Sequence, residues 1–204
     1  MKGLMIKDLI NLKKQGMILG ILFLFYAVLG IMTKDSSMMG AVMAVLAAMM
    51  PVSAMAYDEK AKWDKYALSM PVSRRDMVLS KYLLGILFAI VVFFLNVLFY
   101  GAVNGGKSMT EGVLFAGTLS LSALVYLSLV LPALFRFGVE KGRVLMMAIL
   151  FLGTGGVVFA SLHQGSLPPM ETLERLQTLL LLAVLVILCV SAGLSLRIYN
   201  RKEI

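Results

Sequence analysis

The sequence predicts an all-α, polytopic membrane protein with six transmembrane helices, an N-terminal amphipathic helix at the membrane surface and one further helix between the second and third spans. Three observations support this fold class. Hydrophobic residues make up 60% of the 204 residues and the mean hydropathy is +0.93, a composition typical of membrane proteins. Six apolar segments are long enough to cross a hydrocarbon core of about 30 Å, which takes about 20 residues per helix. The charged residues gather between these segments.

Residues 1–15 precede the first span and have the pattern of a helix lying in the lipid headgroup region. Met5, Leu9 and Leu12 fall on one helical face. Lysines supply a basic side, namely Lys2, Lys7, Lys13 and Lys14. We expect the segment to be retained rather than cleaved as a signal peptide, because a second apolar segment follows the first almost at once.

The six spans belong to one transmembrane domain covering residues 1–204 and are expected at about residues 16–32, 38–56, 82–103, 113–135, 144–162 and 178–196. Small residues recur at helical spacing in the first two spans, as Gly16 and Gly20 and as Gly40, Ala44 and Ala48. Such spacing allows helices to approach closely.

The distribution of Lys and Arg predicts the orientation. If the N-terminus is inside, the inner segments are residues 1–15, 57–81, 136–143 and 197–204. These segments hold sixteen of the nineteen Lys and Arg, which leaves only Lys34, Lys107 and Arg175 for the outer loops. Under the positive-inside rule, both termini and segment 57–81 are cytoplasmic. The net charge of +8 then reflects membrane topology and indicates no nucleic-acid partner.

The predicted spans contain no Asp, Glu, Lys, Arg or His. Charged groups at membrane depth usually mark ion pathways or proton relays, so this composition argues against a proton- or sodium-driven transporter. The polar residues of the spans are expected to form hydrogen bonds between helices, and the main ones are Asn96, Ser120, Ser122, Ser128, Thr154 and Ser191.

Segment 57–81 is longer than a turn between two spans requires, and it carries ten charged side chains and the only tryptophan. No Gly or Pro occurs from residue 57 to residue 69, which favours a helix. Trp63, Tyr66, Ala67 and Met70 recur at i, i+3, i+4 and i+7 and form one apolar stripe. A stripe of this kind on a cytoplasmic helix indicates a docking surface for a partner. A solvated loop with some helical character is the alternative.

The boundaries of this helix follow from local residues. Pro71 pushes Met70 out of the helical region and ends the first helix. Ser73 lies three residues before Asp76, the spacing of an N-terminal cap, so a second helix is expected to run into the third span. Two opposite-charge pairs at i and i+4 would stabilise the first helix by about 0.2–0.5 kcal/mol each: Asp58 with Lys62, and Lys60 with Asp64.

Residues 101–108 match the phosphate-binding expression G-x-x-x-x-G-K-[ST], ending in Gly106, Lys107 and Ser108. That loop holds phosphate only between a strand and a helix. Here an apolar span precedes it, the predicted orientation places it outside, and no strand ending in Asp follows to hold Mg²⁺. We therefore interpret residues 101–108 as a turn.

No catalytic, cofactor or metal site is expected in this chain. His163 is the only histidine and Cys189 the only cysteine, so no His-based metal site and no intrachain disulfide can form. Neither carboxylate pair lies in an apolar pocket of the kind that activates a catalytic acid: Asp58 with Glu59, and Glu171 with Glu174. A polytopic membrane enzyme is therefore disfavoured.

Residues 57–85, YDEKAKWDKYALSMPVSRRDMVLSKYLLG, resemble a segment of small ABC-2 type permease subunits, within the group that includes exporters of phenol-soluble-modulin-like peptides and some bacteriocins. The likeness covers the whole chain by layout, from the start MKGLMIKDL through six spans to two inside termini. It implies a bacterial cell-membrane protein in which segment 57–81 contains a coupling helix, seated in a groove of a separately encoded ATPase that binds the ATP and Mg²⁺. Relatives act as dimers, which implies a second permease chain, identical or related. Residues 167–177 loosely match the extracellular re-entrant helices of such permeases.

The docking role is expected of the following side chains: Tyr57, Asp58, Glu59, Lys60, Trp63, Asp64, Tyr66, Met70, Pro71, Arg74 and Arg75. Trp63 and Tyr66 are the expected apolar anchors, residues 58–60 a polar rim, and the two arginines are expected to hold the start of the third span against lipid headgroups. The expected function is the permease subunit of an ATP-driven exporter for an amphipathic peptide or other lipophilic substrate. The alternative is a membrane structural or assembly protein that recruits a soluble cytoplasmic partner without transport.

Overall fold

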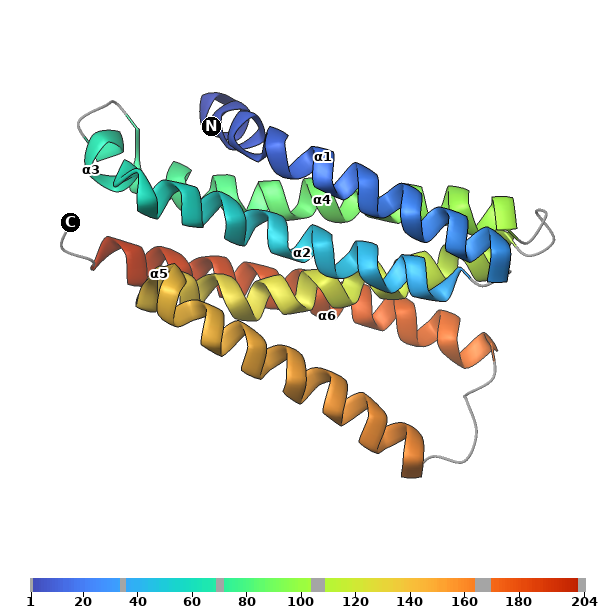
Figure 1. Ribbon diagram of the computed structural model, residues 1–204. Helices are drawn as coiled ribbons and strands as arrows, with labels where there is room; N and C mark the ends of the chain where they lie inside the picture. Colours follow the sequence, from blue (N-terminus) through green and yellow to red (C-terminus); the bar gives the residue numbers. More distant parts are fainter. Residues whose placement is uncertain (1, 34–35, 69–71, 104–108, 164–169, 202–204) are drawn as a thin grey trace.

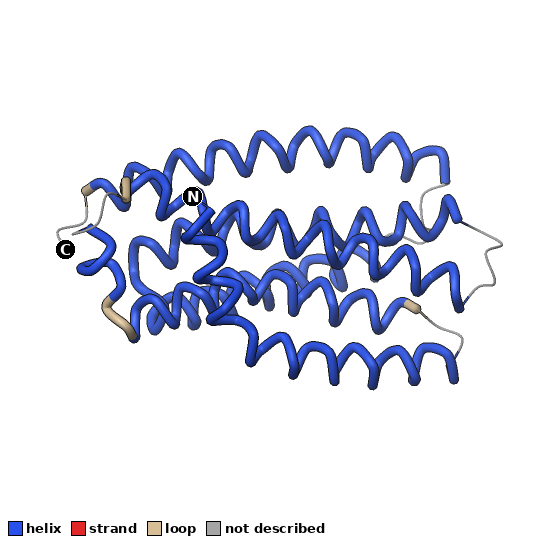
Figure 2. The backbone as a smooth tube through the Cα atoms, turned by 90° about the horizontal axis from the view of Figure 1, so that it is seen from above, coloured by secondary structure: helices blue, strands red, loops and turns tan. Residues whose placement is uncertain are grey.

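The computed structural model describes residues 2–33, 36–68, 72–103, 109–163 and 170–201. Within these ranges the chain contains no strand, and its helices are α1 (Lys2–Thr33), α2 (Ser37–Lys60), α3 (Trp63–Leu68), α4 (Arg74–Val103), α5 (Met109–His163) and α6 (Met170–Asn200). The long helices form one elongated bundle, and the short α3 lies at the end of the bundle that also holds both termini (Figure 1). A second view shows the same lengthwise arrangement (Figure 2). The all-α class is confirmed.

Five of the described helices are long and apolar enough to cross a membrane, over residues Gln15–Thr33, Met39–Lys60, Arg74–Val103, Met109–Gly153 and Leu179–Asn200. The chain is therefore a multi-pass membrane protein. No break separates the expected interfacial segment from the first span, because α1 begins at Lys2 and continues to Thr33. The first turns of α1 are seen almost end-on in Figure 1, so the helix changes direction before it runs along the bundle.

Helix α5 is interrupted at Gly138, whose φ of 78° and ψ of 173° are not helical. A positive φ is accessible to glycine without steric cost, whereas other L-residues are strained there. The chain reverses at this point, so that the two parts of α5 run in opposite directions (Figure 1). We call residues 109–137 the first arm and residues 139–163 the second arm. The spans expected at 113–135 and 144–162 fall on separate arms.

Small residues let α2 approach its neighbours, as the sequence predicts for Gly40, Ala44 and Ala48. A Cβ atom on Gly40 would lie 2.7 Å from Leu119 Cδ1, and the two alanines are buried in a cluster with Ala123 of α5. The prediction of close approach is confirmed here. It is not met at Gly16 and Gly20, where a Cβ would meet nothing within 4 Å.

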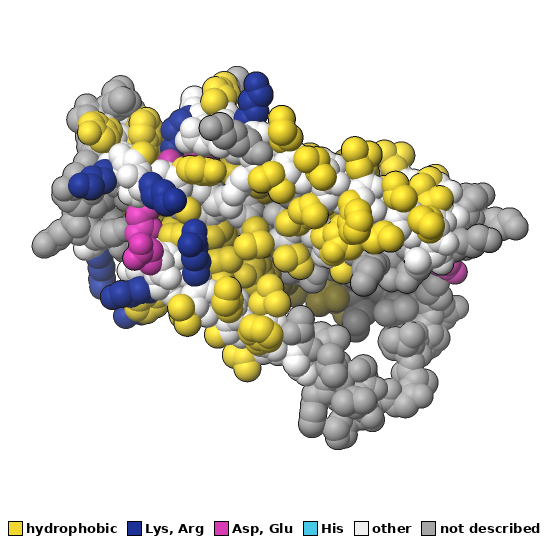
Figure 3. Space-filling model, viewed as in Figure 1, with side chains coloured by type: hydrophobic (Ala, Val, Ile, Leu, Met, Phe, Trp, Pro, Cys, Tyr) yellow, Lys and Arg dark blue, Asp and Glu magenta, His cyan; other side chains and the backbone are white. Residues whose placement is uncertain are grey.

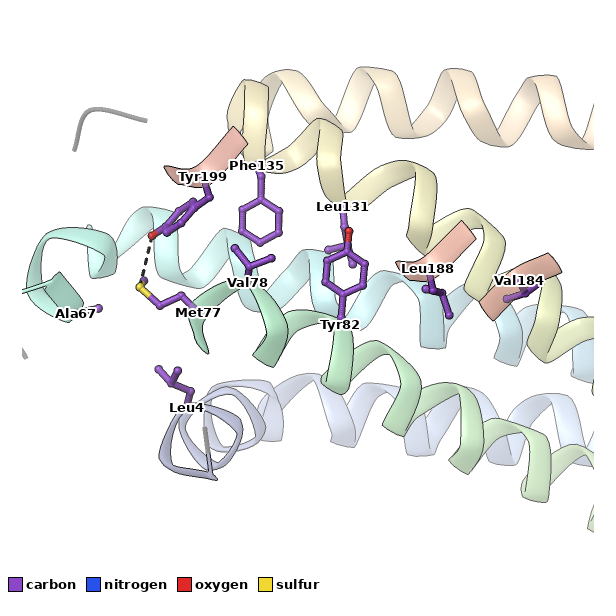
Figure 4. Close-up of a cluster of buried hydrophobic side chains, with 10 residues drawn as sticks. All are labelled: Leu4, Ala67, Met77, Val78, Tyr82, Leu131, Phe135, Val184, Leu188 and Tyr199. Atoms are coloured by element: carbon purple, nitrogen blue, oxygen red, sulfur yellow. Dashed lines mark hydrogen bonds between the residues drawn. The ribbon is translucent and has the colours of Figure 1, made fainter. Parts of the chain in front are cut away.

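A core cluster at the end of the bundle near α3 joins α1, α3, α4, α5 and α6 (Figure 4). Its members are Leu4, Ala67, Met77, Val78, Tyr82, Leu131, Phe135, Val184, Leu188 and Tyr199. The Tyr82 hydroxyl is 2.7 Å from Ser191 Oγ and 2.8 Å from Ser195 Oγ. Ser191 also donates to the Ser128 carbonyl of α5, so the expected interhelical bonding of Ser191 is confirmed. In contrast, Asn96 Nδ2 and Ser120 Oγ are buried without a hydrogen-bond partner.

The surface divides into an apolar body and a charged end. Hydrophobic side chains cover the length of the bundle, whereas Lys and Arg gather around the end that holds α3 and both termini (Figure 3). On α1 the exposed apolar side chains include Met17, Ile21 and Phe25, and on α6 they include Leu182 and Val186. Exposed apolar stretches of this length fit contact with lipid.

Candidate functional site

Four charged side chains form a largely buried ion network, and two of them, Asp58 and Lys81, belong to segment 57–81. Lys81 Nζ lies 2.7 Å from Asp8 Oδ2 and 2.6 Å from Asp58 Oδ2. Lys7 Nζ lies 2.5 Å from Asp58 Oδ1 and 3.2 Å from Asp8 Oδ1, and the latter contact lacks hydrogen-bond geometry. The side chains of Lys81 and Asp8 are only 7% and 1% exposed. The network joins α1, α2 and α4.

Burial of these charges is tolerable only because they compensate one another, two positive against two negative. A buried pair of this kind adds little net stability compared with an apolar replacement, but removing one partner leaves an uncompensated charge. The network therefore fixes the relative positions of three helices more than it raises the free energy of unfolding.

Trp63 lies directly beside this network. The Lys7 ammonium is 4.4 Å from the centroid of the Trp63 ring, within range of a cation–π contact. The ring packs against the core cluster, and its Nε1 is buried without a hydrogen-bond partner. Trp63 and the network residues Lys7, Asp58 and Lys81 line a pocket of about 100 Å³. The predicted partner anchor Trp63 thus contacts its own chain.

Glu59 joins segment 57–81 to the reversal in α5. Its Oε2 accepts a hydrogen bond of 2.7 Å from the backbone N–H of Val139. That N–H lies in the first turn of the second arm, where helical N–H groups have no partner within the helix. Glu59 therefore caps the second arm from another helix.

The chain breaks between α2 and α3, although the sequence predicts one continuous helix here. Lys62 has a φ of 50°, outside the helical region, and the Lys62 N–H bonds to the Glu59 carbonyl at 3.1 Å. The expected pairing of Asp58 with Lys62 is replaced, because both carboxylate oxygens of Asp58 are engaged by Lys7 and Lys81. These tertiary ion pairs outweigh a local pair of a few tenths of a kcal/mol.

The start of α4 is held at both its backbone and its side chains. Ser73 Oγ accepts a hydrogen bond of 3.1 Å from the Asp76 N–H, so the predicted cap is confirmed. Arg74 donates to the carbonyls of Asn200 at 2.9 Å and Tyr199 at 3.4 Å. These carbonyls belong to the last turn of α6, where a cation is favourable. Arg74, for which a position at the lipid headgroups is expected, also ties α4 to α6.

The predicted docking residues therefore separate into two groups. Asp58, Glu59, Trp63 and Arg74 make the intrachain contacts described above. Of the polar rim expected at residues 58–60, Glu59 and Lys60 are exposed and Asp58 is partly buried. Exposed at the surface are Tyr57, Lys60, Tyr66 and Arg75, with Tyr66 62% exposed. The side chain of Asp64 and all of Met70 and Pro71 lie outside the described residues.

Four residues of this site are not predicted from the sequence: Lys7, Asp8, Lys81 and Gly138. Asp8 is the only acidic residue in the basic segment 1–15, and Lys81 stands at the edge of an apolar span. An isolated acidic residue and a lysine at the edge of a span are the two sequence features that indicate a buried ion pair. Gly138 has no comparable signal beyond being a glycine between two spans.

The contacts of this site hold helices α1, α2, α4 and α5 together. Among the described residues, no group of three or more His, Cys, Asp or Glu could hold a metal ion. The phosphate-loop look-alike begins in the last turn of α4, which ends at Val103, and its residues 104–108 lie outside the described part. A 30-residue helix before the loop differs from the strand that a phosphate loop needs.

Comparison with known protein families assigns the chain to a class. A family profile described as "ABC-2 family transporter protein" matches residues 3–200. Because this match spans almost the whole sequence, the chain belongs to the ABC-2 transporter family. Proteins of this family are membrane components of ABC transporters, which in general work with an ABC ATPase. Comparisons with curated proteins and with solved structures find no match.

Proposed function

We propose that this chain is the permease subunit of an ATP-driven exporter, with a separate ABC ATPase that docks on the exposed residues Tyr57, Lys60 and Tyr66. We call these three residues the docking face. The observation that carries the proposal is the two-sided character of segment 57–68. Asp58 contacts α1 and α4 and Glu59 contacts α5, and Tyr66 is 62% exposed.

An exposed tyrosine on a firmly held short helix suits an interface anchor, because interface energy concentrates in a few aromatic and arginine side chains. Trp63, half-buried against the core cluster, has a supporting role and holds α3 in place. ATP and Mg²⁺ are bound by the ATPase subunit. Movement of the docked ATPase then displaces the docking face, and the ion network passes this displacement to the membrane helices.

The proposed topology has six spans with both termini in the cytoplasm of a bacterial cell, and α5 supplies two of the spans. Each arm of α5 exceeds the about 20 residues that a bilayer requires. The gathering of Lys and Arg at the end with α3 supports this orientation under the positive-inside rule. Segment 57–81 then faces the compartment in which ATP is found.

The exporter is proposed to contain two permease chains, identical or related, with the substrate path between them. The close packing of α2 and α4 against α5, through Gly40 and Gly85, favours a path between chains over one through a single chain. An amphipathic peptide or other lipophilic molecule is the proposed substrate, in keeping with predicted spans that carry no charged side chain.

The test is reconstitution of the chain with a co-expressed ABC ATPase in lipid vesicles. We expect ATP hydrolysis to rise with amphipathic peptide, and the peptide to move across the membrane only with ATP. The variant Lys107→Ala serves as a control and should behave as wild type, because the look-alike loop binds no nucleotide. Recruitment of the ATPase without ATP-dependent movement of any peptide or lipophilic compound would favour the structural or assembly protein instead.

A further inference from the structure

Among the described side chains of the second arm, the buried ones lie near its base. Val139 and Met146 are buried against Val52, Val130 and Leu134. Farther along, the exposed fractions rise to 72% for Phe151 and 76% for Leu152. In Figure 1 this arm diverges from the remaining helices as it runs away from the charged end. Its direction is therefore set near residues 138–146.

Two features meet at this base. Gly138 provides the positive φ that reverses the chain. The Glu59 carboxylate closes the reversal from outside, because Oε2 accepts from the Val139 N–H while Oε1 lies 3.1 Å from the point where a Cβ of residue 138 would be. The Glu59 carboxylate can therefore approach the Val139 N–H closely because residue 138 is a glycine and has no Cβ.

Glu59 also occupies a particular place in the sequence. It directly follows Asp58, whose carboxylate binds Lys7 and Lys81, and its carbonyl accepts the Lys62 N–H in the turn that leads to α3. A displacement of α3 relative to α2 would change the geometry of this turn. It would therefore also move Glu59, the residue that caps the second arm.

We propose that Glu59 is a positioning residue that sets the direction of the second arm about Gly138 and passes movement of α3 to that arm. The inference rests on the proposed function for the source of the movement, an ATPase docked at α3. The cap and the pivot themselves belong to this chain alone. Partner docking then changes the arm's angle by shifting or releasing the Glu59 carboxylate.

The experiment measures the arm's position in the full-length chain in lipid nanodiscs. Spin labels are attached to cysteines replacing Met147 on the second arm and Phe94 on α4, both exposed, in a Cys189→Ser background. A second pair, at Phe94 and at the exposed Val190 of α6, reports on the bundle without the arm. Distance distributions of both pairs are compared between wild type, Glu59→Ala and Glu59→Gln.

We expect Glu59→Ala to shift and broaden the 94–147 distribution while the 94–190 distribution stays as in wild type. Glu59→Gln keeps a carbonyl oxygen that can accept from Val139, and it should restore the wild-type distribution. An unchanged 94–147 distance in Glu59→Ala would overturn the proposal. Equal changes in both pairs would also count against it, since they would indicate loosening of the whole bundle.

A separate measurement, co-purification of the ABC ATPase with the wild-type chain, tests the proposed function. If no ATPase binds, the proposed source of movement is wrong, while the label distances still decide whether Glu59 holds the arm. If the ATPase binds, adding it with ATP to the wild-type label pair should shift the 94–147 distance, and no shift would contradict the transmission step.

Discussion

Lys81 of α4 donates a hydrogen bond of 2.7 Å to Asp8 of α1, 73 residues earlier in the sequence. Both side chains are almost fully buried, and Asp58 of α2 binds the same ammonium at 2.6 Å. The first turns of α1 are thereby fixed to α4, the helix that leaves segment 57–81.

Removing Lys81 alone should be strongly destabilising. Lys81→Met leaves Asp8 and Asp58 with a single lysine between them, and uncompensated buried charge costs about 3–5 kcal/mol. The double variant Asp8→Leu with Lys81→Met leaves the neutral pair of Lys7 and Asp58, so it should lose less than Lys81→Met alone. Thermal unfolding in detergent measures this, with the exposed Lys60→Met as a control within about 0.5 kcal/mol of wild type. Strictly additive losses would show that the residues do not act as one network.

Trp63 provides a fluorescence reporter at the site, because it is the only tryptophan. Lys7 covers its ring at 4.4 Å, so Lys7→Met should alter the emission of Trp63 and make it more accessible to acrylamide. Lys13→Met, on an exposed lysine of the same helix, should leave both unchanged. Equal quenching of Trp63 in wild type and Lys7→Met would contradict the observed contact.

Gly40 and Gly16 should respond very differently to a larger side chain. Gly40→Leu would push into Leu119 and Phe115, which lie 2.7 and 2.9 Å from the added Cβ, and overpacking costs about 1–3 kcal/mol. Gly16→Leu should change the stability by less than about 0.5 kcal/mol, since nothing lies within 4 Å. Apparent melting temperatures of the two variants provide the comparison, and similar values would argue against the close contact of α2 with α5.

The proposed orientation predicts which positions are reached from outside the cell. A membrane-impermeant thiol reagent should label a cysteine at Ser37 but not one at Ser73 or Asn200, in a Cys189→Ser background. Labelling before and after permeabilisation confirms that the inner positions are reactive. Labelling of residue 73 from outside would reverse the topology and remove segment 57–81 from any cytoplasmic partner.

Features that depend on local composition could be predicted from the sequence. The apolar segments appear as the long helices, and Ser73 caps α4 as its spacing from Asp76 indicates. The approach of α2 through Gly40 also follows from small-residue spacing. Each of these rests on residues that are neighbours along one continuous stretch of the sequence.

Features that depend on contacts between distant residues could not be predicted in the same way. Segment 57–70 contains no Gly or Pro before Pro71, so nothing local predicts the break at Lys62. The break accompanies the engagement of Asp58 and Glu59 by residues of α1, α4 and α5, far away in sequence. For the same reason the sequence places Trp63 on the partner side, whereas it packs inward.

Docking of an ABC ATPase on Tyr66 and its neighbours is tested by measuring ATPase binding to three variants of this chain. Tyr66→Ala, Lys60→Ala and Phe94→Ala are compared, the last removing an exposed aromatic of α4 outside the docking face. Truncating an interface anchor costs about 2 kcal/mol or more, which corresponds to about thirtyfold weaker binding. We predict that loss for Tyr66→Ala, a smaller loss for Lys60→Ala and none for Phe94→Ala, with peptide-stimulated ATP hydrolysis falling in the same order. Wild-type ATPase binding and hydrolysis in Tyr66→Ala would show that the ATPase does not dock on this residue.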